Sequence, residues 1–359
     1  MVEPLAAAYG TTDDRTTILV RVIGDGVEGW GECIAFREPT YMSDWSNGEY
    51  LVLTEMFVPA LMDAREVSAA EVTKVLAGFR GHHTAKAALE LAVLDAELRS
   101  AQTSLATHFG ATASDVECVI VVGLLNGDAL MRSLEQHINR GYRHVKLKIA
   151  PGRDVERIDL VQSRFPGLSL QVDANGSYDW NNPEHRAALI DVDKRDVAFI
   201  EQPIAPGNAR AFFAMREAIH TPIALDESVV SFARALDALD IMGCDTFVLK
   251  PGLLGGYLTA KELHDECLER DVATMVGGML ETGVARAANL ALAGLPGFSR
   301  HPAEVAQDGR WFHESVLQGP VHMVEGRIAI PTAPGIGVDV DLSVVNRLTR
   351  RSHIARVGR

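Results

Sequence analysis

Hydrophobic positions follow one rhythm in the first third of this chain and another in most of the remainder. Residues 16–36 (TTILVRVIGDGVEGWGECIAF) alternate in the manner of two antiparallel strands joined by a Gly-Asp-Gly turn. Residues 84–110 carry apolar residues at helical spacing as far as Gly110, a residue type suited to a helix C-terminus. The pattern predicts a small α+β domain over residues 1–115.

From about Glu117 the pattern changes to short apolar strands, each followed by a stretch of helical periodicity. The seven strand-like segments are CVIVVGLL, HVKLKI, LSLQVDAN, VAFIEQP, PIALDES, TFVLKPG and ATMVGGM. Such an order predicts parallel strands with helical crossovers, for which a closed (β/α)₈ barrel is the commonest solution and a doubly wound open sheet the alternative. We expect an α/β barrel over residues 116–319 and a C-terminal segment, residues 320–359, that returns to the first domain.

Polar residues recur where successive strands end. Lys148, Asp173, Glu201, Asp226, Lys250 and Gly277 stand at these ends, at successive spacings of 25, 28, 25, 24 and 27 residues. This recurrence has the length of a βα unit, so the side chains are expected to ring one end of the barrel, where barrel enzymes have their active sites.

Three of these strand-end residues are carboxylates, namely Asp173, Glu201 and Asp226. Carboxylates that converge in a partly buried site repel one another unless a cation lies between them. An all-oxygen ligand set suits Mg²⁺ or Mn²⁺ and leaves positions for water and substrate oxygens. A single strand-end acid is more often a helix cap, and only the matched positions of all three favour a metal site.

Lys146 and Lys148 share one face of the strand HVKLKI, because the side chains of a strand alternate between its faces. A solvent-exposed edge strand is the ordinary explanation of such a pair. In a closed barrel, Lys148 and Lys250 would instead face each other from opposite sides. A lysine that acts as a base at neutral pH must lose about three units from its usual pKa of ~10.4. The set predicts proton removal next to a carboxylate, with the enediolate held by the metal and by Lys146.

Composition narrows the possible partners. The net charge of -14 and the pI near 5.3 disfavour nucleic acid and anionic membranes, because phosphate groups are repelled. The four cysteines include no C-x-x-C pair, and the chain has no signal peptide or apolar run long enough to span a membrane. We therefore expect a cytoplasmic protein with a small anionic carboxylate as its substrate.

The motifs K-L-K, V-D-A-N, I-E-Q-P, L-D-E-S, L-K-P-G and G-G-M-L-E-T-G together resemble those of the enolase superfamily, in its muconate-lactonising subgroup. Within it, the stretch from Met279 to Gly283 and the following ARAANLALAGLPGF are most similar to the o-succinylbenzoate synthase and N-succinylamino acid racemase branch. The resemblance covers nearly the whole chain, with GWGEC at 29–33 in the capping domain and PGIGV in the returning tail.

This resemblance implies a Mg²⁺-dependent enzyme that dehydrates a cyclohexadiene carboxylate to o-succinylbenzoate on the route to menaquinone. It implies Lys148 and Lys250 as the acid/base pair, and it gives Asp173, Glu201 and Asp226 as the metal ligands. Substrate contacts are expected from Lys146, Asn175, Gly277 and Met279, with Glu227 as a supporting residue. We also expect a homo-oligomer.

Two departures from the family pattern bear on function. Racemising members tend to carry an arginine three residues after the second lysine, where this chain has Leu253, which favours the synthase. The first segment matches the middle of the family's first capping segment, so about fifteen residues usual in such chains are expected to be missing before it. His82 and His83 are interpreted as a solvated turn between helices.

Two other functions remain open at this point. One is racemisation of N-acylamino acids, or a related cycloisomerisation, by the same lysine pair. The other is a barrel without catalytic activity that binds a small ligand, which predicts that a lysine or a metal carboxylate has been lost. None has been lost here.

Overall fold

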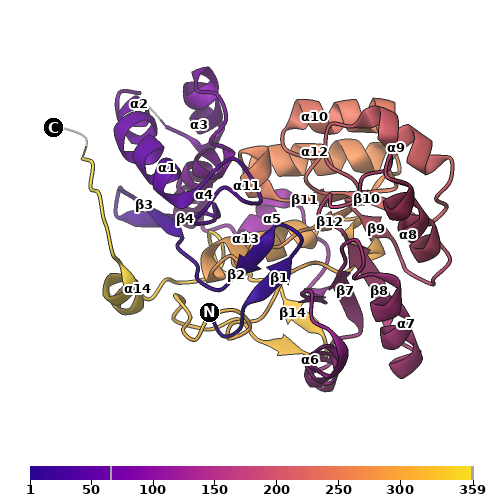
Figure 1. Cartoon of the computed structure of the whole chain (residues 1–359). Coiled ribbons are helices and arrows are strands. Elements are labelled where there is room, and N and C mark those ends of the chain that lie inside the picture. The colour runs from indigo at the N-terminus through magenta and orange to yellow at the C-terminus, as the bar shows by residue number, and fades with distance from the viewer. Residues whose placement is uncertain (65–66, 357–359) are drawn as a thin grey trace.

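Seven parallel strands form the centre of the molecule, in a computed structural model that describes residues 1–64 and 67–356 (Figure 1). They run in the order β12-β11-β10-β9-β8-β7-β6, so each strand lies beside the next one in sequence. In a doubly wound sheet the order of the strands reverses at a switch point, and in this sheet it does not. The strands are β6 (Val119–Val122), β7 (His144–Lys148), β8 (Ser169–Asp173), β9 (Ile200–Glu201), β10 (Ile223–Leu225), β11 (Thr246–Leu249) and β12 (Ala273–Val276).

A short extended segment at Ala303 and Glu304 occupies the eighth position between β12 and β6. The Glu304 amide donates to the Val276 carbonyl at 2.9 Å, and the Val119 amide donates to the Ala303 carbonyl at 3.0 Å. The segment therefore has partners on both neighbouring strands and closes the ring. The predicted α/β barrel is confirmed, with an eighth strand too short to show as a hydrophobic run.

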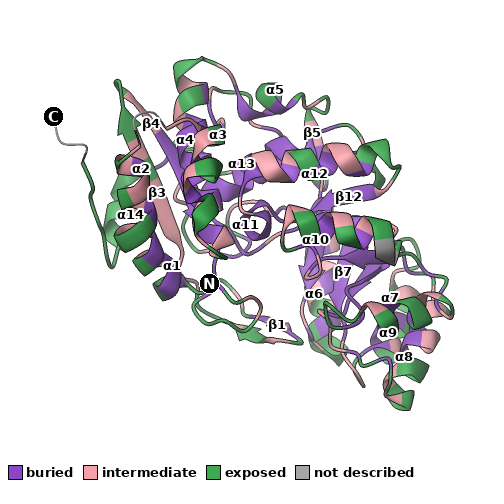
Figure 2. Cartoon of the chain, turned by 90° about the horizontal axis from the view of Figure 1, so that it is seen from above, coloured by how far each residue is buried: buried purple, intermediate pink, exposed green. Residues whose placement is uncertain are grey.

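The crossover helices surround this barrel. In Figure 2 the central strands are buried, while α8, α9 and α10 expose one face to solvent. Phe199, Ala224, Val248 and Met275 form a separate apolar cluster from neighbouring strands, as expected for a packed barrel interior. The helices are α6 (Gly127–Asn139), α7 (Val155–Arg164), α8 (Pro183–Asp193), α9 (Ala209–Arg216), α10 (Phe232–Asp237), α11 (Pro251–Leu254), α12 (Tyr257–Glu269) and α13 (Gly283–Ala293).

The N-terminal region is an α+β capping domain, as predicted. Its antiparallel hairpin, β3 (Ile18–Gly24) and β4 (Val27–Cys33), packs on the long helix α4 (His83–Ser100). A Cβ at Gly29 or Gly31 would lie within about 2 Å of a carbonyl oxygen of α4, so only glycine permits this packing. The other elements are β1 (Leu5–Ala7), β2 (Gly10–Thr12), α1 (Ser46–Val52), α2 (Val58–Met62), α3 (Ala69–Val75) and α5 (Leu105–Phe109).

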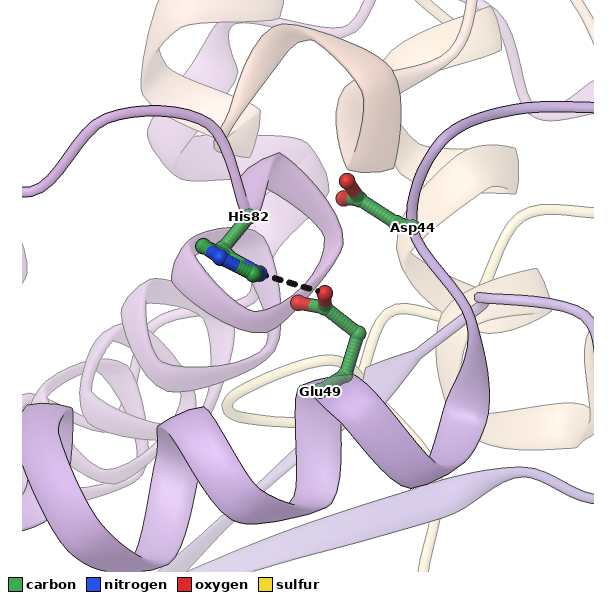
Figure 3. A group of neighbouring side chains, drawn as sticks. All are labelled: Asp44, Glu49 and His82. Carbon is green, nitrogen blue, oxygen red and sulfur yellow. Dashed lines mark hydrogen bonds and ion pairs between the residues drawn. The ribbon is translucent and has the colours of Figure 1, made fainter. Parts of the chain in front are cut away.

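Two local expectations for the capping domain need correction. The helical run to Gly110 is two helices, because the Ser104 hydroxyl accepts from the Thr107 amide and starts α5, which Gly110 then ends at φ 82°. His82 does not lie in a solvated turn: it precedes α4, its side chain is 33% exposed, and its Nδ1 lies 2.7 Å from Glu49 Oε1 (Figure 3). The sequence could not show this contact because the two residues are 33 positions apart.

The C-terminal residues contact both parts of the molecule. Strand β14 (Arg327–Ala329) pairs with β13 (Met323–Val324) and with β5 (Asp115–Glu117), while the Ile336 amide donates to Asp95 on α4. Helix α14 (Leu342–Leu348) follows. The domain boundaries near residues 115 and 319 stay predictions. Among the described residues, no helix is long and apolar enough to cross a membrane.

Candidate active site

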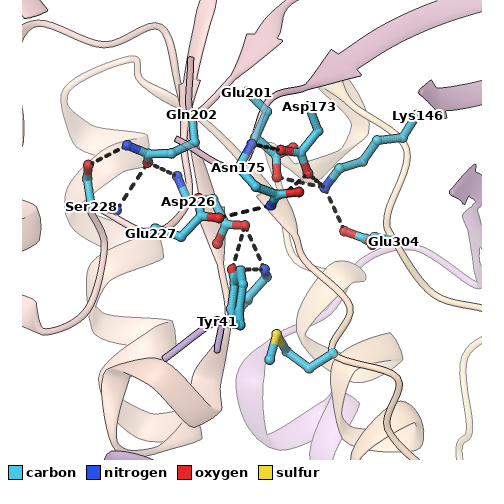
Figure 4. Close-up of polar contacts among 12 residues, drawn as sticks. Tyr41, Lys146, Asp173, Asn175, Glu201, Gln202, Asp226, Glu227, Ser228 and Glu304 are labelled. Carbon is cyan, nitrogen blue, oxygen red and sulfur yellow. Dashed lines mark hydrogen bonds and ion pairs between the residues drawn. The ribbon is translucent and has the colours of Figure 1, made fainter. Parts of the chain in front are cut away.

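The strand-end carboxylates Asp173, Glu201 and Asp226 meet at one end of the barrel (Figure 4). In the parallel ladder Lys148 lies opposite Asp173, and Asp173 lies opposite Glu201, so register places the three at one level. Asp226 follows β10 directly, and Lys250 follows β11. The βα spacing of the sequence thus becomes a ring of charged side chains.

The three carboxylates of this ring, Asp173, Glu201 and Asp226, form a compact acidic group. One oxygen from each lies within 4.8 Å of the others, and all three residues are buried. Glu201 Oε2 and Asp226 Oδ1 are buried without a hydrogen-bond partner. Burial and the neighbouring Asp173 charge raise the pKa of Glu201 well above its usual value. Unpartnered oxygens in a converging all-oxygen set fit a divalent cation such as Mg²⁺.

Lysine ammonium groups surround these acids. Lys148 Nζ donates to Asp173 Oδ2 at 2.6 Å, and Lys250 Nζ donates to Asp226 Oδ2 at 2.6 Å. Lys146 Nζ lies 2.6 Å from Glu201 Oε1 and 3.1 Å from Asp173 Oδ2. Both lysines expected to act in acid/base chemistry, Lys148 and Lys250, line the same small cavity.

The direction of the lysine pKa shifts differs from the expectation. Burial is the largest influence on Lys148 and lowers its pKa, but Asp173 together with other acidic neighbours such as Glu304 raises the pKa above its usual value. For Lys250 burial is again the largest influence and lowers the pKa, while Asp226, Glu304 and Glu227 together raise it above its usual value. A divalent cation on these carboxylate oxygens would compete with the ion pairs and add positive charge, and both effects lower a lysine pKa.

Two residues at the site were missed from the sequence. Glu304, in the short eighth segment, accepts a hydrogen bond from Lys146 Nζ at 2.9 Å through Oε2. Tyr41, from a loop of the capping domain, accepts from Lys250 Nζ at 2.6 Å and donates to Asp226 Oδ2 at 2.9 Å. Neither residue lies in a periodic hydrophobic pattern, and a motif search limited to strand ends could not find them.

Asn175 and Glu227 lie directly behind the acids. The Asn175 amide group donates to Glu227 Oε1 at 2.9 Å through Nδ2, and its backbone N–H donates to Asp173 Oδ1 at 2.9 Å. Burial, followed by the charge of Asp226, raises the pKa of Glu227 to about 8. These contacts orient Asp173 and link the loops after β8 and β10.

Gly277 lies against the Lys250 side chain, while Gly278 and Met279 line the cavity itself. A Cβ at Gly277 would come within 2.7 Å of Lys250 Cε, so glycine leaves the space that the lysine stem occupies. Met279 lines the cavity and is buried. The cavity volume is about 40 Å³, which is too small for a cyclic dicarboxylate, so the cap must move for such a substrate to enter.

The roof of this cavity is aromatic and comes from the capping domain. Tyr9 follows β1, and its ring centroid lies 5.0 Å from that of Tyr41 and 6.2 Å from that of Phe36. Lys250 Nζ also lies 4.8 Å from the centroid of the Tyr41 ring. The cap thus presents flat apolar surfaces to the space between the lysines.

Comparison with known proteins agrees with this geometry. Residues 1–110 match the mandelate racemase / muconate lactonizing enzyme N-terminal domain, and residues 129–344 match the enolase C-terminal domain-like family. The chain therefore belongs to the enolase superfamily, and it is an enzyme of that superfamily.

Its relatives point to one branch. An N-succinylamino acid racemase from Amycolatopsis is 38% identical over 94% of this chain and 91% of its own length. The o-succinylbenzoate synthase of Bacillus subtilis is 32% identical over 98% and 94%. A solved enolase-superfamily structure from Listeria innocua superposes with a TM-score of 0.90 at 31% identity, covering 97% of this chain and 94% of that one.

Proposed function

We propose that this protein is a Mg²⁺-dependent o-succinylbenzoate synthase that converts 2-succinyl-6-hydroxy-2,4-cyclohexadiene-1-carboxylate to o-succinylbenzoate and water, in menaquinone biosynthesis. The observation that carries the proposal is the placement of Lys148 and Lys250 on one cavity beside three converging carboxylates. Asp173, Glu201 and Asp226 would hold Mg²⁺, which supplies positive charge where the substrate carboxylate becomes an enediolate.

Lys148 acts as the base in this proposal. Its neutral amine takes the proton from the carbon that bears the carboxylate, and the electron pair of that C–H bond moves into the carboxylate. The resulting ammonium group then returns the proton to the leaving hydroxyl, so that the C–O bond breaks, water departs and the ring becomes aromatic. Lys146 and Lys250 stabilise the negative charge, Lys250 from beside the ring.

Racemisation of an N-succinylamino acid is the second candidate. It is supported by the presence of both lysines and by the similarity to the Amycolatopsis racemase. In that reaction one lysine removes the α-proton and the other delivers a proton to the opposite face. Leu253, buried where racemising relatives tend to have arginine, favours the synthase.

The test is an ultraviolet assay of ring aromatisation with Mg²⁺, run beside solvent-deuterium exchange on both enantiomers of an N-succinylamino acid. We expect rapid aromatisation and a loss of at least about 10³-fold in Lys148→Ala. Lys194→Ala, at an exposed lysine paired only with Asp191, is the matched control. The racemase would instead be identified by two results together. The wild type would not aromatise the cyclohexadiene, and deuterium exchange would be abolished for one enantiomer by Lys148→Ala and for the other by Lys250→Ala.

A further inference from the structure

A second cluster of metal-ligating side chains lies in the capping domain. Asp44 comes from the loop before α1, Glu49 from α1 and His82 from the residue before α4. One ligand atom from each lies within 4.8 Å of the others. Figure 3 shows the three side chains turned toward a common space. None of these residues takes part in the proposed barrel chemistry.

The charge in this cluster is not balanced by a strong cation. Glu49 is fully buried and Asp44 nearly so, and across the described parts of the chain neither carboxylate forms an ion pair with lysine or arginine. Lys86, the nearby cation, donates instead to the Phe79 carbonyl at 2.6 Å. Two carboxylates at this separation repel each other unless positive charge is supplied.

One oxygen in the cluster has no partner. Glu49 Oε1 lies 2.7 Å from His82 Nδ1, and Asp44 Oδ2 accepts from the amide and hydroxyl of Thr84 at 3.2 and 3.0 Å. Glu49 Oε2, in contrast, is buried without a hydrogen bond. A buried and unpartnered carboxylate oxygen usually marks an ion or a water that completes the site.

We propose that Asp44, Glu49 and His82 bind a divalent transition-metal cation, with Zn²⁺ as the best-matched ion. An imidazole nitrogen together with carboxylate oxygens suits Zn²⁺, whereas the all-oxygen barrel set suits Mg²⁺. The two sites therefore differ in the metal that they prefer. Water would complete the coordination, because His82 is partly exposed and gives access to solvent.

The site has a structural consequence for the barrel. Asp44 lies three residues after Tyr41, whose hydroxyl contacts Lys250 and Asp226. A cation bound to Asp44 would join this loop to α1 and to the start of α4. The cluster is thus placed to fix the loop that carries Tyr41 over the active site.

The experiment measures metal content of the full chain. Protein stripped with chelator is dialysed against limiting Zn²⁺ with Mg²⁺ in large excess, and bound zinc is counted by elemental analysis. We expect one zinc per chain in wild type and none in Glu49→Gln or His82→Gln. Asp226→Asn, altered only in the barrel, should retain its zinc, and so should Glu71→Gln, at an exposed acid paired with Lys74.

Substitution of Co²⁺ for Zn²⁺ gives a second readout, because its visible absorption reports the coordination number of the bound ion and should be lost in His82→Gln. Absence of stoichiometric zinc in wild type, or equal zinc in His82→Gln, would overturn the proposal. Zinc lost from Asp226→Asn but kept by Glu49→Gln would place the ion in the barrel, which also overturns it. His82→Gln keeps the test valid if Glu49→Gln does not fold, since His82 lies at the partly exposed edge of the cluster.

Discussion

Buried carboxylates occur in two parts of this molecule, and their surroundings differ. In the capping domain, Glu32 accepts from the Thr282 amide at 2.8 Å, from its hydroxyl at 2.7 Å and from the Ala285 amide at 3.1 Å. Glu90 likewise accepts from the amides of Tyr257 and Leu258, at the start of α12. These acids of the cap complete the N-termini of barrel helices.

The acids of the barrel mouth have different partners. Glu201 and Asp226 each retain an unpartnered buried oxygen, and their hydrogen-bond donors include lysine ammonium groups. A carboxylate saturated by backbone amides is fixed in place and has no capacity for a ligand. Burial alone therefore does not identify a functional acid in this protein, whereas an unsatisfied oxygen beside other carboxylates does.

The largest difference between the effect on activity and the effect on stability is expected for Glu201→Gln. Catalytic activity should fall by more than about 10³-fold, because the proposed metal site loses one of its three carboxylates. In chelator, however, the free energy of unfolding should stay within about 1 kcal/mol of wild type or rise, since burial and Asp173 already oppose the charge of Glu201. Activity assays and urea unfolding in EDTA check both halves. A loss of stability beyond about 2 kcal/mol would make Glu201 a structural acid.

Glu32→Ala should give the opposite result. It leaves the Thr282 and Ala285 amides without an acceptor in a buried contact between cap and barrel, at a cost of about 3 kcal/mol in the free energy of unfolding. Mg²⁺ affinity at the barrel should not change. Urea unfolding and calorimetric Mg²⁺ titration measure the two quantities, and Glu262→Ala, at an exposed position of α12, is a suitable control. A tenfold weaker Mg²⁺ affinity would show that Glu32 also shapes the metal site.

Glu90 should make stability depend on pH. Burial raises the pKa of this carboxyl to about 7, so the folded chain holds a proton that the unfolded chain releases at lower pH. The contribution of Glu90 to the free energy of unfolding should thus be complete below about pH 5 and should fall by about 2 kcal/mol from about pH 5 to about pH 8. Glu90→Gln removes this proton and should flatten that part of the unfolding profile. An unchanged slope in Glu90→Gln would assign the pH dependence to other groups.

The sequence predicted the barrel, its acids and its lysines because these residues recur with the period of the βα unit. Glu304 escaped prediction because the segment that closes the barrel is too short for hydrophobic alternation. The ion pairs that raise the pKa of Lys148 and Lys250 escaped prediction, because no spacing in the sequence reveals contacts of 2.6 Å. The environment of His82 was predicted wrongly for a related reason, since its partner Glu49 lies on α1, 33 positions away in the sequence.

Tyr41→Phe tests how far the cap contributes to the barrel site, with the smallest expected effect. The ring and its contact with Lys250 remain, and only the hydroxyl that bridges Lys250 and Asp226 is lost. Activity should fall about tenfold, which corresponds to one hydrogen bond to a charged group at about 1.4 kcal/mol. The loss should appear in kcat, because Lys250 loses its orientation while the aromatic roof is kept. Phe36→Leu, which alters the roof without touching a lysine, should instead raise KM. If Tyr41→Phe changes only KM, the hydroxyl serves binding, and the cap acts on the barrel only as a lid.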